Sequence, residues 1–288
     1  MLSRSLPRVL CIAAATLLMT SGCGDDSPTV DQPKAGALAS LLPQAIRDKG
    51  TLDVGSDIAY PPVESFGTDG KTAIGLDPDL AKEIGDLLGV KLVFHNGTFN
   101  GLIPSLTSKR IDLIMSAMSD SKKRQQSVDF VDYFVVGTSI IVKKGNPEGI
   151  TTLDDLCGKT IAIQQGTTQD DVAEAQKAKC GANKLSILKF PTDPEALLQV
   201  KQGRAVADMN DFPVAKDVVK KTGDYEVVGE QIEAGPYGIA VRKTDTQLRD
   251  ALRKAVQMLI DNGTYQRILE KYDVTDGAVT EAKINGGT

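Results

Sequence analysis

Arg124 is the residue whose setting most clearly suggests a chemical role. It ends the stretch SAMSDSKKR (residues 116–124), which directly follows the apolar run IDLIM. A guanidinium placed just beyond a buried strand can bind a ligand carboxylate through two parallel hydrogen bonds. The alternative is a solvated surface charge, which we expect for Lys122 and Lys123. The pattern therefore leaves a choice between a binding site and an ordinary surface helix.

Two short motifs suggest a serine enzyme, but their surroundings do not. Ser119 and Lys122 fit S-x-x-K, and residues 221–223 fit the K-T-G that accompanies it in penicillin-interacting enzymes. The third motif, S-D-N, is missing from the sequence, and K-T-G lies in a glycine turn. His95 is the single histidine, which leaves little for a catalytic triad or a transition-metal site. We expect no catalysis, no cofactor and no metal.

The elements that would position these residues alternate in type. Three β-rich runs are separated by helical runs, a pattern typical of a mainly parallel sheet flanked by helices; the β-rich runs lie at residues 51–57, 91–95 and 111–117. Asp77 before Pro78, and Asp193 before Pro194, predict N-caps of two helices.

Two further β-rich runs, at residues 138–145 and 237–243, bracket a second α/β segment. If both are strands between lobes, lobe 1 is discontinuous, and a hinge follows from that topology. The predicted division is 49–142 plus 238–274 for lobe 1 and 143–237 for lobe 2.

The N-terminus predicts export. Arg4 and Arg8 precede a short apolar run that is followed by small residues and Cys23, as in a signal peptide of residues 1–22 with a lipidated cysteine after it. We expect residues 23–48 to be a tether and residues 275–288 to be a disordered tail. Such a protein would be held by its lipid at the outer face of the bacterial cell membrane.

Cysteine count and charge agree with this location. Cys157 and Cys180 remain as one even pair in an oxidising compartment, so we predict a disulfide between them. The net charge of −5 makes nucleic acid an improbable partner. We expect a monomer.

Five ordered motifs resemble the polar amino acid family of bacterial solute-binding proteins, which feed ABC importers. The motifs are YPPVE (60–64), IGLDPDLAKEIGDLLGV (74–90), FNGLIPSL (99–106), MSAMSDSKKRQQSVDFVDYF (115–134) and IAIQQGTTQDD (161–171). The resemblance implies a two-lobed periplasmic-binding-protein-like fold, with two crossover strands between mainly parallel sheets. This sequence departs from the family pattern at two places. The segment VDFVDYF lacks the proline that usually follows its second aspartate, and Val206 stands where an aspartate is common.

The resemblance also implies roles for individual residues. Arg124 matches the carboxylate clamp, Ser119 a backbone N–H donor to that carboxylate, and Ala117 a carbonyl acceptor for the ammonium. Asp211 matches the carboxylate that binds the ammonium. The other expected ligand-binding residues are the aromatic walls Tyr60 and Phe99, then Met118, the helix start at Thr167, Thr168 and Gln169, and Asp57.

Asp57 bears on which amino acid binds. In the family its position faces the far end of the ligand side chain, where an anion disfavours a second carboxylate. We therefore expect arginine, lysine, histidine or glutamine rather than glutamate or aspartate. The alternative is that Asp57 caps the turn into Tyr60.

Together these patterns predict an extracytoplasmic lipoprotein that captures a polar amino acid and delivers it to an ABC permease. Two alternatives stay open: a dehydratase-type lyase of the same fold, and the S-x-x-K serine enzyme.

Overall fold

The computed structural model describes residues 34–288. The predicted signal peptide, the lipidation at Cys23 and the first part of the tether lie outside the described residues. Within the part of the chain that is described, no helix has both the length and the apolar character needed to cross a membrane.

Helices and strands alternate along most of this range. The α-helices are α1 (Gln44–Lys49), α2 (Leu76–Leu88), α3 (Phe99–Thr107), α4 (Lys122–Gln125), α5 (Thr168–Lys179), α6 (Asp193–Lys201), α7 (Phe212–Thr222), α8 (Thr246–Asp261) and α9 (Thr264–Lys271). The strands are β1 (Thr51–Ser56), β2 (Ala59–Tyr60), β3 (Glu64–Phe66), β4 (Ala73–Ile74), β5 (Lys91–Asn96), β6 (Leu113–Ile114), β7 (Val128–Lys143), β8 (Thr160–Gln164), β9 (Ser186–Phe190), β10 (Ala207–Asp211) and β11 (Tyr225–Arg242). Short 3-10 turns lie at Ala39–Leu41, Asp154–Leu156 and Thr275–Gly277.

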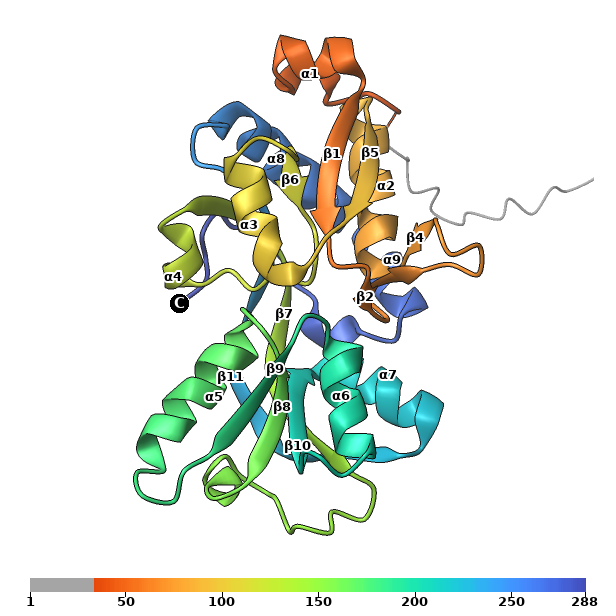
Figure 1. The fold of residues 1–288 in the computed structure, drawn as a ribbon. Helices are drawn as coiled ribbons and strands as arrows, with labels where there is room; N and C mark the ends of the chain where they lie inside the picture. Colours follow the sequence, from red (N-terminus) through yellow and green to blue (C-terminus); the bar gives the residue numbers. More distant parts are fainter. Residues whose placement is uncertain (1–33) are drawn as a thin grey trace, which may run out of the picture. The chain divides into compact units, whose positions relative to one another are not determined.

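Eight strands form one sheet in the order β5-β1-β6-β11-β7-β10-β8-β9 (Figure 1). β1 pairs in parallel with β5 and β6, and β8 pairs in parallel with β9 and β10. Between these groups lie β7 and β11, which are antiparallel to each other. We call the part with β1, β5 and β6 lobe 1 and the part with β8, β9 and β10 lobe 2. The predicted α/β fold with two connecting strands is confirmed.

The predicted domain boundaries, after residues 142 and 237, fall inside β7 and β11. β7 and β11 stay paired with each other past both residues, although the pairing of β7 with β10 ends at Val142 and the β7–β11 register shifts between Tyr237 and Gly238. The exact division into domains therefore stays a prediction.

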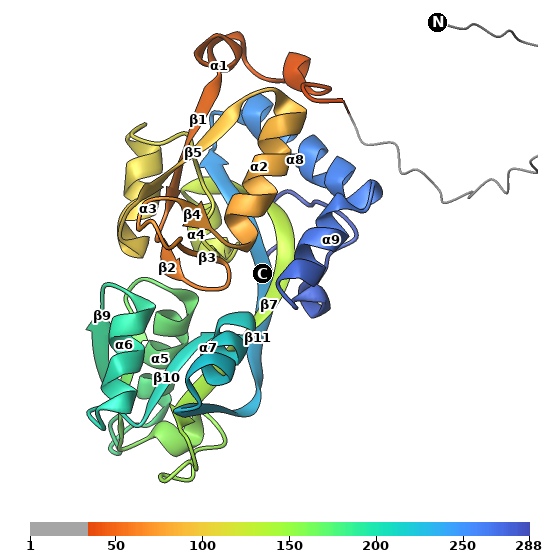
Figure 2. The ribbon, with the colours of Figure 1, turned by 90° about the vertical axis from the view of Figure 1, so that its right-hand side faces the viewer.

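Each lobe has its own apolar core. α2, α8 and α9 pack in lobe 1, and α5, α6 and α7 in lobe 2 (Figure 2). Leu52 and Leu113 are fully buried in lobe 1, and Ile161 and Ile163 in lobe 2. Burial of this kind contributes roughly 1.5–3 kcal/mol for each large apolar side chain.

Aromatic side chains fill the place where β7 and β11 leave lobe 1. Tyr133, Phe134 and Tyr237 are fully buried, and the Tyr237 ring centroid lies 5.7 Å from that of Phe134 and 6.2 Å from that of Tyr133. Ring pairs at this separation add about 0.5–1.5 kcal/mol beyond area burial. This cluster stiffens the base of the connecting strands beside the site described below.

Both predicted N-caps are wrong by a residue or two. α2 has Gly75 as its N-cap, and Asp77 lies inside its first turn with its carboxylate turned to other partners. In α6 the N-cap is Thr192, which forms a capping box with Glu195, and Asp193 is the first helical residue. Asp-Pro fits the first turn as well as the cap, because an acid is favourable anywhere in the first turn of a helix.

Residues 34–48 do not form a free tether. Leu38 and Leu42 are buried in the core of lobe 1. The N–H groups of Gly36 and Leu38 donate to the carbonyls of Asp86 and Leu87 at 2.7 and 2.9 Å. This apolar and backbone pairing, near the end of α2, holds the segment against the lobe.

The prediction of a disordered tail at residues 275–288 is also wrong. The segment follows the surface of lobe 1, and Ile284 forms an antiparallel bridge with Val131. Its backbone N–H groups find buried acceptors, which a polar, glycine-rich composition does not reveal.

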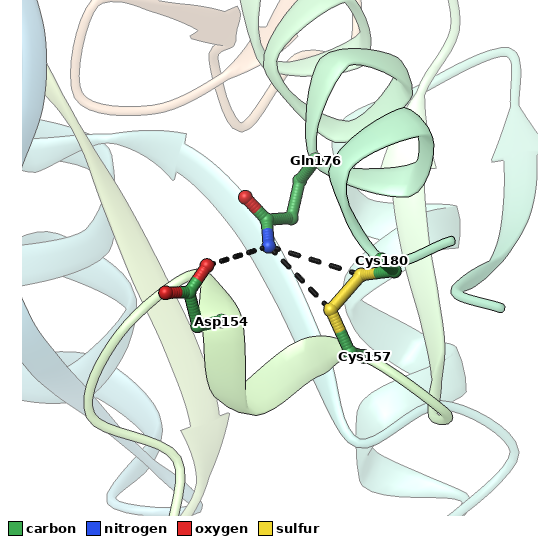
Figure 3. The surroundings of a disulfide bond; sticks show 4 residues. All are labelled: Asp154, Cys157, Gln176 and Cys180. Carbon is green, nitrogen blue, oxygen red and sulfur yellow. Dashed lines mark hydrogen bonds between the residues drawn. A yellow bond between two sulfur atoms is a disulfide. The ribbon is translucent and has the colours of Figure 1, made fainter. Parts of the chain in front are cut away.

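The predicted disulfide between Cys157 and Cys180 is confirmed, with Cα atoms 5.4 Å apart. It joins the turn before β8 to the C-terminal end of α5 (Figure 3). Between these elements the Gln176 amide donates to Asp154 Oδ1 at 2.9 Å and lies 3.5 Å from Cys157 Sγ. The far end of α5 is thereby held covalently to lobe 2.

Candidate functional site

A cavity lies between the lobes. Lobe 1 lines it from the end of β1, from β2 and β3, from the start of α3 and from the loop before α4. Lobe 2 lines it from the turn between β8 and α5 and from the end of β10. The lining residues are Asp57, Tyr60, Glu64, Phe99, Ser116, Ala117, Ser119, Arg124, Gln164, Thr167, Thr168, Gln169 and Asp211.

Asp211 ends β10 and is the most heavily hydrogen-bonded acid of the cavity. Its Oδ2 accepts from the hydroxyls of Tyr237 at 2.7 Å and Tyr60 at 3.1 Å, and its Oδ1 accepts from the Gln169 amide at 2.8 Å. Burial raises the pKa of Asp211 to about 6, although these donors and the charge of Arg124 oppose the rise. A cation beside this carboxylate would favour its ionised form.

Asp57 directly follows β1, and its side chain reaches across the cavity to lobe 2. Its Oδ2 accepts from Gln164 Nε2 at 2.6 Å, and the same amide nitrogen donates to the Pro191 carbonyl at 3.1 Å. Burial raises the pKa of Asp57 to about 6, with the Gln164 bond opposing and the charge of Glu195 adding to the rise. The carboxylate faces the other lobe and is not the cap of its own turn.

Arg124 lies in α4 with its guanidinium held at two points. Nη1 donates to the Ser119 carbonyl at 2.7 Å, and Nη2 donates to the Gly166 carbonyl of lobe 2 at 3.1 Å. The guanidinium carbon lies 5.2 Å from the centroid of the Phe99 ring. Burial lowers the pKa of Arg124 to about 10, so the side chain keeps its charge at neutral pH. Such a fixed, partly desolvated cation suits a carboxylate ligand.

Ala117 has an unusual backbone that an acid of lobe 1 supports. Its φ is +46°, a region that non-glycine residues rarely adopt. The Ala117 N–H donates to Asp77 Oδ2 at 3.2 Å, and the Tyr133 hydroxyl donates to Asp77 Oδ1 at 2.6 Å. Asp77 thus fixes the strained turn in the cavity wall, where strain of this kind is often functional.

The start of α5 brings polar groups to the cavity from lobe 2. Thr167 is the N-cap, and its hydroxyl accepts from the Asp170 N–H at 3.1 Å. Thr168 is the first helical residue, and its hydroxyl lies 3.4 Å from that of Ser119 across the cleft. N–H groups at a helix start are suited to an anion.

Glu64 is a third buried acid of the cavity and lies close to Asp57. Ser116 Oγ donates to Glu64 Oε1 at 3.4 Å and accepts from the Asp57 N–H at 2.9 Å. Burial, and then the negative charges of Asp77 and Asp57, raise the pKa of Glu64 well above its usual range. Burial and these neighbouring charges therefore favour the protonated form of Glu64.

Comparison with known proteins decides the family. The pattern of bacterial extracellular solute-binding proteins, family 3, matches residues 52–275. The chain belongs to this family.

Two relatives and one solved structure illustrate this solute-binding family. The histidine-binding periplasmic protein of Escherichia coli is 33% identical over 248 residues, covering 83% of this chain and 91% of that protein. The arginine-binding protein ArgT of Corynebacterium glutamicum is 29% identical over 253 residues, covering 86% and 82%. An ancestral arginine-binding protein bound to arginine matches with a TM-score of 0.73 and 38% identity, covering 77% of this chain and 98% of that one.

Ten of the eleven residues predicted for the site line the cavity. Met118 does not, because its side chain is buried in the apolar cluster around Leu102 and Leu106. Ala117 and Ser119 on either side of Met118 line the cavity, while the Met118 side chain packs into the core of lobe 1.

Sequence reasoning missed three lining residues: Glu64, Ser116 and Gln164. Gln164 ends β8 just before the Gly166 turn, so the strand-end argument used for Arg124 could have found it. Glu64 is the last residue of YPPVE, and Ser116 is the first of SAMSDSKKR. Nothing in the sequence around either residue indicates that their side chains are in contact.

The S-x-x-K reading has no support from geometry. The Lys122 ammonium donates to Gln125 at 3.2 Å on the surface, while the Ser119 hydroxyl faces Thr168. Lys221–Gly223 ends α7 and does not lie on a strand. Residues 34–288 also contain no group of three or more histidine, cysteine or acidic side chains placed to hold a metal.

Proposed function

We propose that the chain captures an amino acid with a cationic or carboxamide side chain between its lobes and delivers it to an ABC permease. Arginine is the favoured ligand. The observation that carries this proposal is the charge of the cavity, in which the ionisable groups Asp57 and Asp211 face one arginine, Arg124. A ligand with one carboxylate and two cationic groups complements that set.

Each ligand group has a partner within the cavity. The ligand carboxylate would bind the Arg124 guanidinium and the N–H groups at the start of α5. Its ammonium would bind Asp211 and the Ala117 carbonyl, and its side chain would extend past Tyr60 and Phe99 towards Asp57. The proposal is supported by relatives named as arginine-binding and histidine-binding, and by the ancestral arginine-binding protein also solved with glutamine.

The cellular setting is part of the same proposal. Export by the N-terminal signal and a lipid on Cys23 would hold the protein at the outer face of the cell membrane. Ligand binding would stabilise the closed arrangement of the lobes, which the permease would then recognise.

A thermal-shift screen of the exported domain against the common amino acids tests the proposal. A ligand present at a hundred times its Kd stabilises by about 2.7 kcal/mol, which raises the unfolding midpoint by roughly 5 to 10 °C at this chain length. We expect the largest rise with arginine and a smaller one with glutamine. The absence of any rise with all amino acids would refute the proposal.

A further inference from the structure

Residues 283–287, which we call the C-terminal clasp, lie along the first residues of β7. The Asp132 N–H donates to the Lys283 carbonyl at 2.9 Å, and the Asn285 N–H donates to the Phe130 carbonyl at 3.2 Å. The side chain of Asn285 accepts from the Phe130 N–H at 2.8 Å. These bonds add a short antiparallel edge to β7, and the chain then ends beside α4 (Figure 1).

The clasp continues onto two neighbouring buried carboxylates. The Gly286 N–H donates to Asp132 Oδ2 at 2.9 Å, and the Gly287 N–H donates to Asp120 Oδ2 at 2.8 Å. Asp132 Oδ1 has no hydrogen-bond partner within residues 34–288. Leaving these buried carboxyl oxygens without the two donors would be costly, because a buried acceptor with no hydrogen bond loses its solvation without compensation.

Both glycines of the clasp lie very close to an acidic residue, and Gly287 approaches its backbone. A Cβ added to Gly287 would lie 1.9 Å from the Asp120 carbonyl oxygen, and one added to Gly286 would lie 2.5 Å from Asp132 Oδ2. Neither distance is possible for real side chains. The contact between clasp and carboxylates therefore depends on these two residue types.

The carboxylates connect the clasp to the cavity. Asp120 follows Ser119, whose carbonyl accepts from Arg124 Nη1 at 2.7 Å. The other Asp120 oxygen accepts from the amide of Gln125, the residue after Arg124, at 2.8 Å. On its other side the loop is held by β11, where the Asp120 N–H donates to the Pro236 carbonyl at 2.8 Å.

Packing alone does not hold this loop. A second, solvent-open cavity lies beside the first and shares Ser119, Thr168 and Asp211 with it; Asp120 also lines it. The loop has no packing partner on the side of this space, and hydrogen bonds from β11 and from the clasp hold it on its other sides.

We propose that the C-terminal clasp is a positioning element that holds the Ser119–Arg124 loop in the geometry needed to bind the ligand carboxylate. The inference rests on the proposed function of the cavity and adds a role for residues outside it. The clasp does not line the ligand cavity, and it acts through Asp120 and through Gln125, whose amide donates to the Asn285 and Gly287 carbonyls at 3.3 and 3.4 Å.

A double-mutant comparison of arginine affinity tests the clasp. We expect Gly287→Ala to weaken binding of L-arginine roughly tenfold, a typical coupling between residues of one hydrogen-bond network. In a protein that already carries Arg124→Lys, we expect Gly287→Ala to reduce the arginine affinity much less. Lysine cannot bind the ligand carboxylate through two parallel hydrogen bonds, so the clasp has no such geometry to maintain. A merely structural role would weaken binding equally in both backgrounds. Equal losses, or normal affinity of Gly287→Ala, would overturn the inference.

A matched control and a second measurement keep the outcomes separate. Gly67→Ala places a Cβ at an ordinary contact distance of 3.5 Å, away from the clasp, and should leave affinity unchanged. In the unmutated protein, the Gly286 and Gly287 amides should exchange hydrogen as slowly as the Asp120 amide. If the protein binds arginine but the Gly286 and Gly287 amides exchange as fast as those of an unstructured peptide, the inference is also overturned. Failure of the unmutated protein to bind any amino acid would instead contradict the proposed function.

Discussion

At the scale of single residues, Arg124 is the group on which the proposed ligand geometry most depends. Arg124→Lys keeps the charge but loses the planar fork, and Arg124→Ala leaves the ligand carboxylate unpaired. We expect the alanine variant to lose roughly 2 to 5 kcal/mol of arginine affinity, measured by calorimetry. Agmatine, which is arginine without its carboxylate, should bind the two variants and the unmutated protein about equally. Normal arginine affinity in the alanine variant would return Arg124 to an ordinary surface charge.

Asp57 is the residue that should set ligand selectivity. Asp57→Asn removes a charge but keeps an acceptor for Gln164, so the fold should be unaffected. We expect arginine to lose about 1.5 to 3 kcal/mol of affinity and glutamine less, because a charged hydrogen bond is stronger than a neutral one. Competition binding of the two ligands measures the change. An equal loss for both would show that Asp57 has no role in selecting charge.

At the scale of elements, α5 carries the anion-binding end at Thr168 and the disulfide at its opposite end. Replacing Cys157 and Cys180 with serine opens a loop of 23 residues. We expect the loss of unfolding free energy in urea to be on the order of 3 kcal/mol. Arginine affinity should change little, because the cavity lies at the other end of the helix. A large loss of affinity with unchanged stability would contradict this separation.

The elements also show what could be predicted from sequence. The polar residues at strand ends and the approximate starts of helices could be predicted, because apolar periodicity and glycine turns in the neighbouring sequence indicate them. The role of Asp77 was not, since its contacts with Ala117 and Tyr133 join segments far apart in the chain. The order of residues 283–287 was missed for the same reason, as Asp120 and Asp132 attract backbone donors that no local pattern reveals.

At the scale of the whole molecule, buried carboxylates should make stability and ligand affinity respond to pH in opposite directions. Asp57, Asp77 and Asp211 have pKa values raised to about 6, and Asp132 and Asp193 to about 7, mainly by burial. Because these values exceed those of the unfolded chain, the stability they contribute is present at low pH and is lost as pH rises through 6 to 7. The ligand-free protein should therefore unfold at a higher temperature at pH 5 than at pH 8.

Arginine affinity should show the reverse trend. Binding of a cation needs ionised Asp57 and Asp211, so the Kd should be constant above pH 7 and rise by up to about tenfold for each pH unit and each proton below 6. Asp57→Asn should make both trends shallower. Affinity that improves on acidification would contradict the assignment of these carboxylates to the ligand cations.

The central claim is that the cavity between the lobes is built for an amino acid with a cationic or carboxamide side chain and not for one with a second carboxylate. Its most direct test is the ratio of the calorimetric dissociation constants of L-arginine and L-glutamate for the unmutated protein at pH 7.5. We predict that arginine binds roughly a hundredfold or more tightly, because a second ligand carboxylate would face Asp57 at a cost of several kcal/mol. Binding of glutamate as tight as that of arginine would contradict the claim.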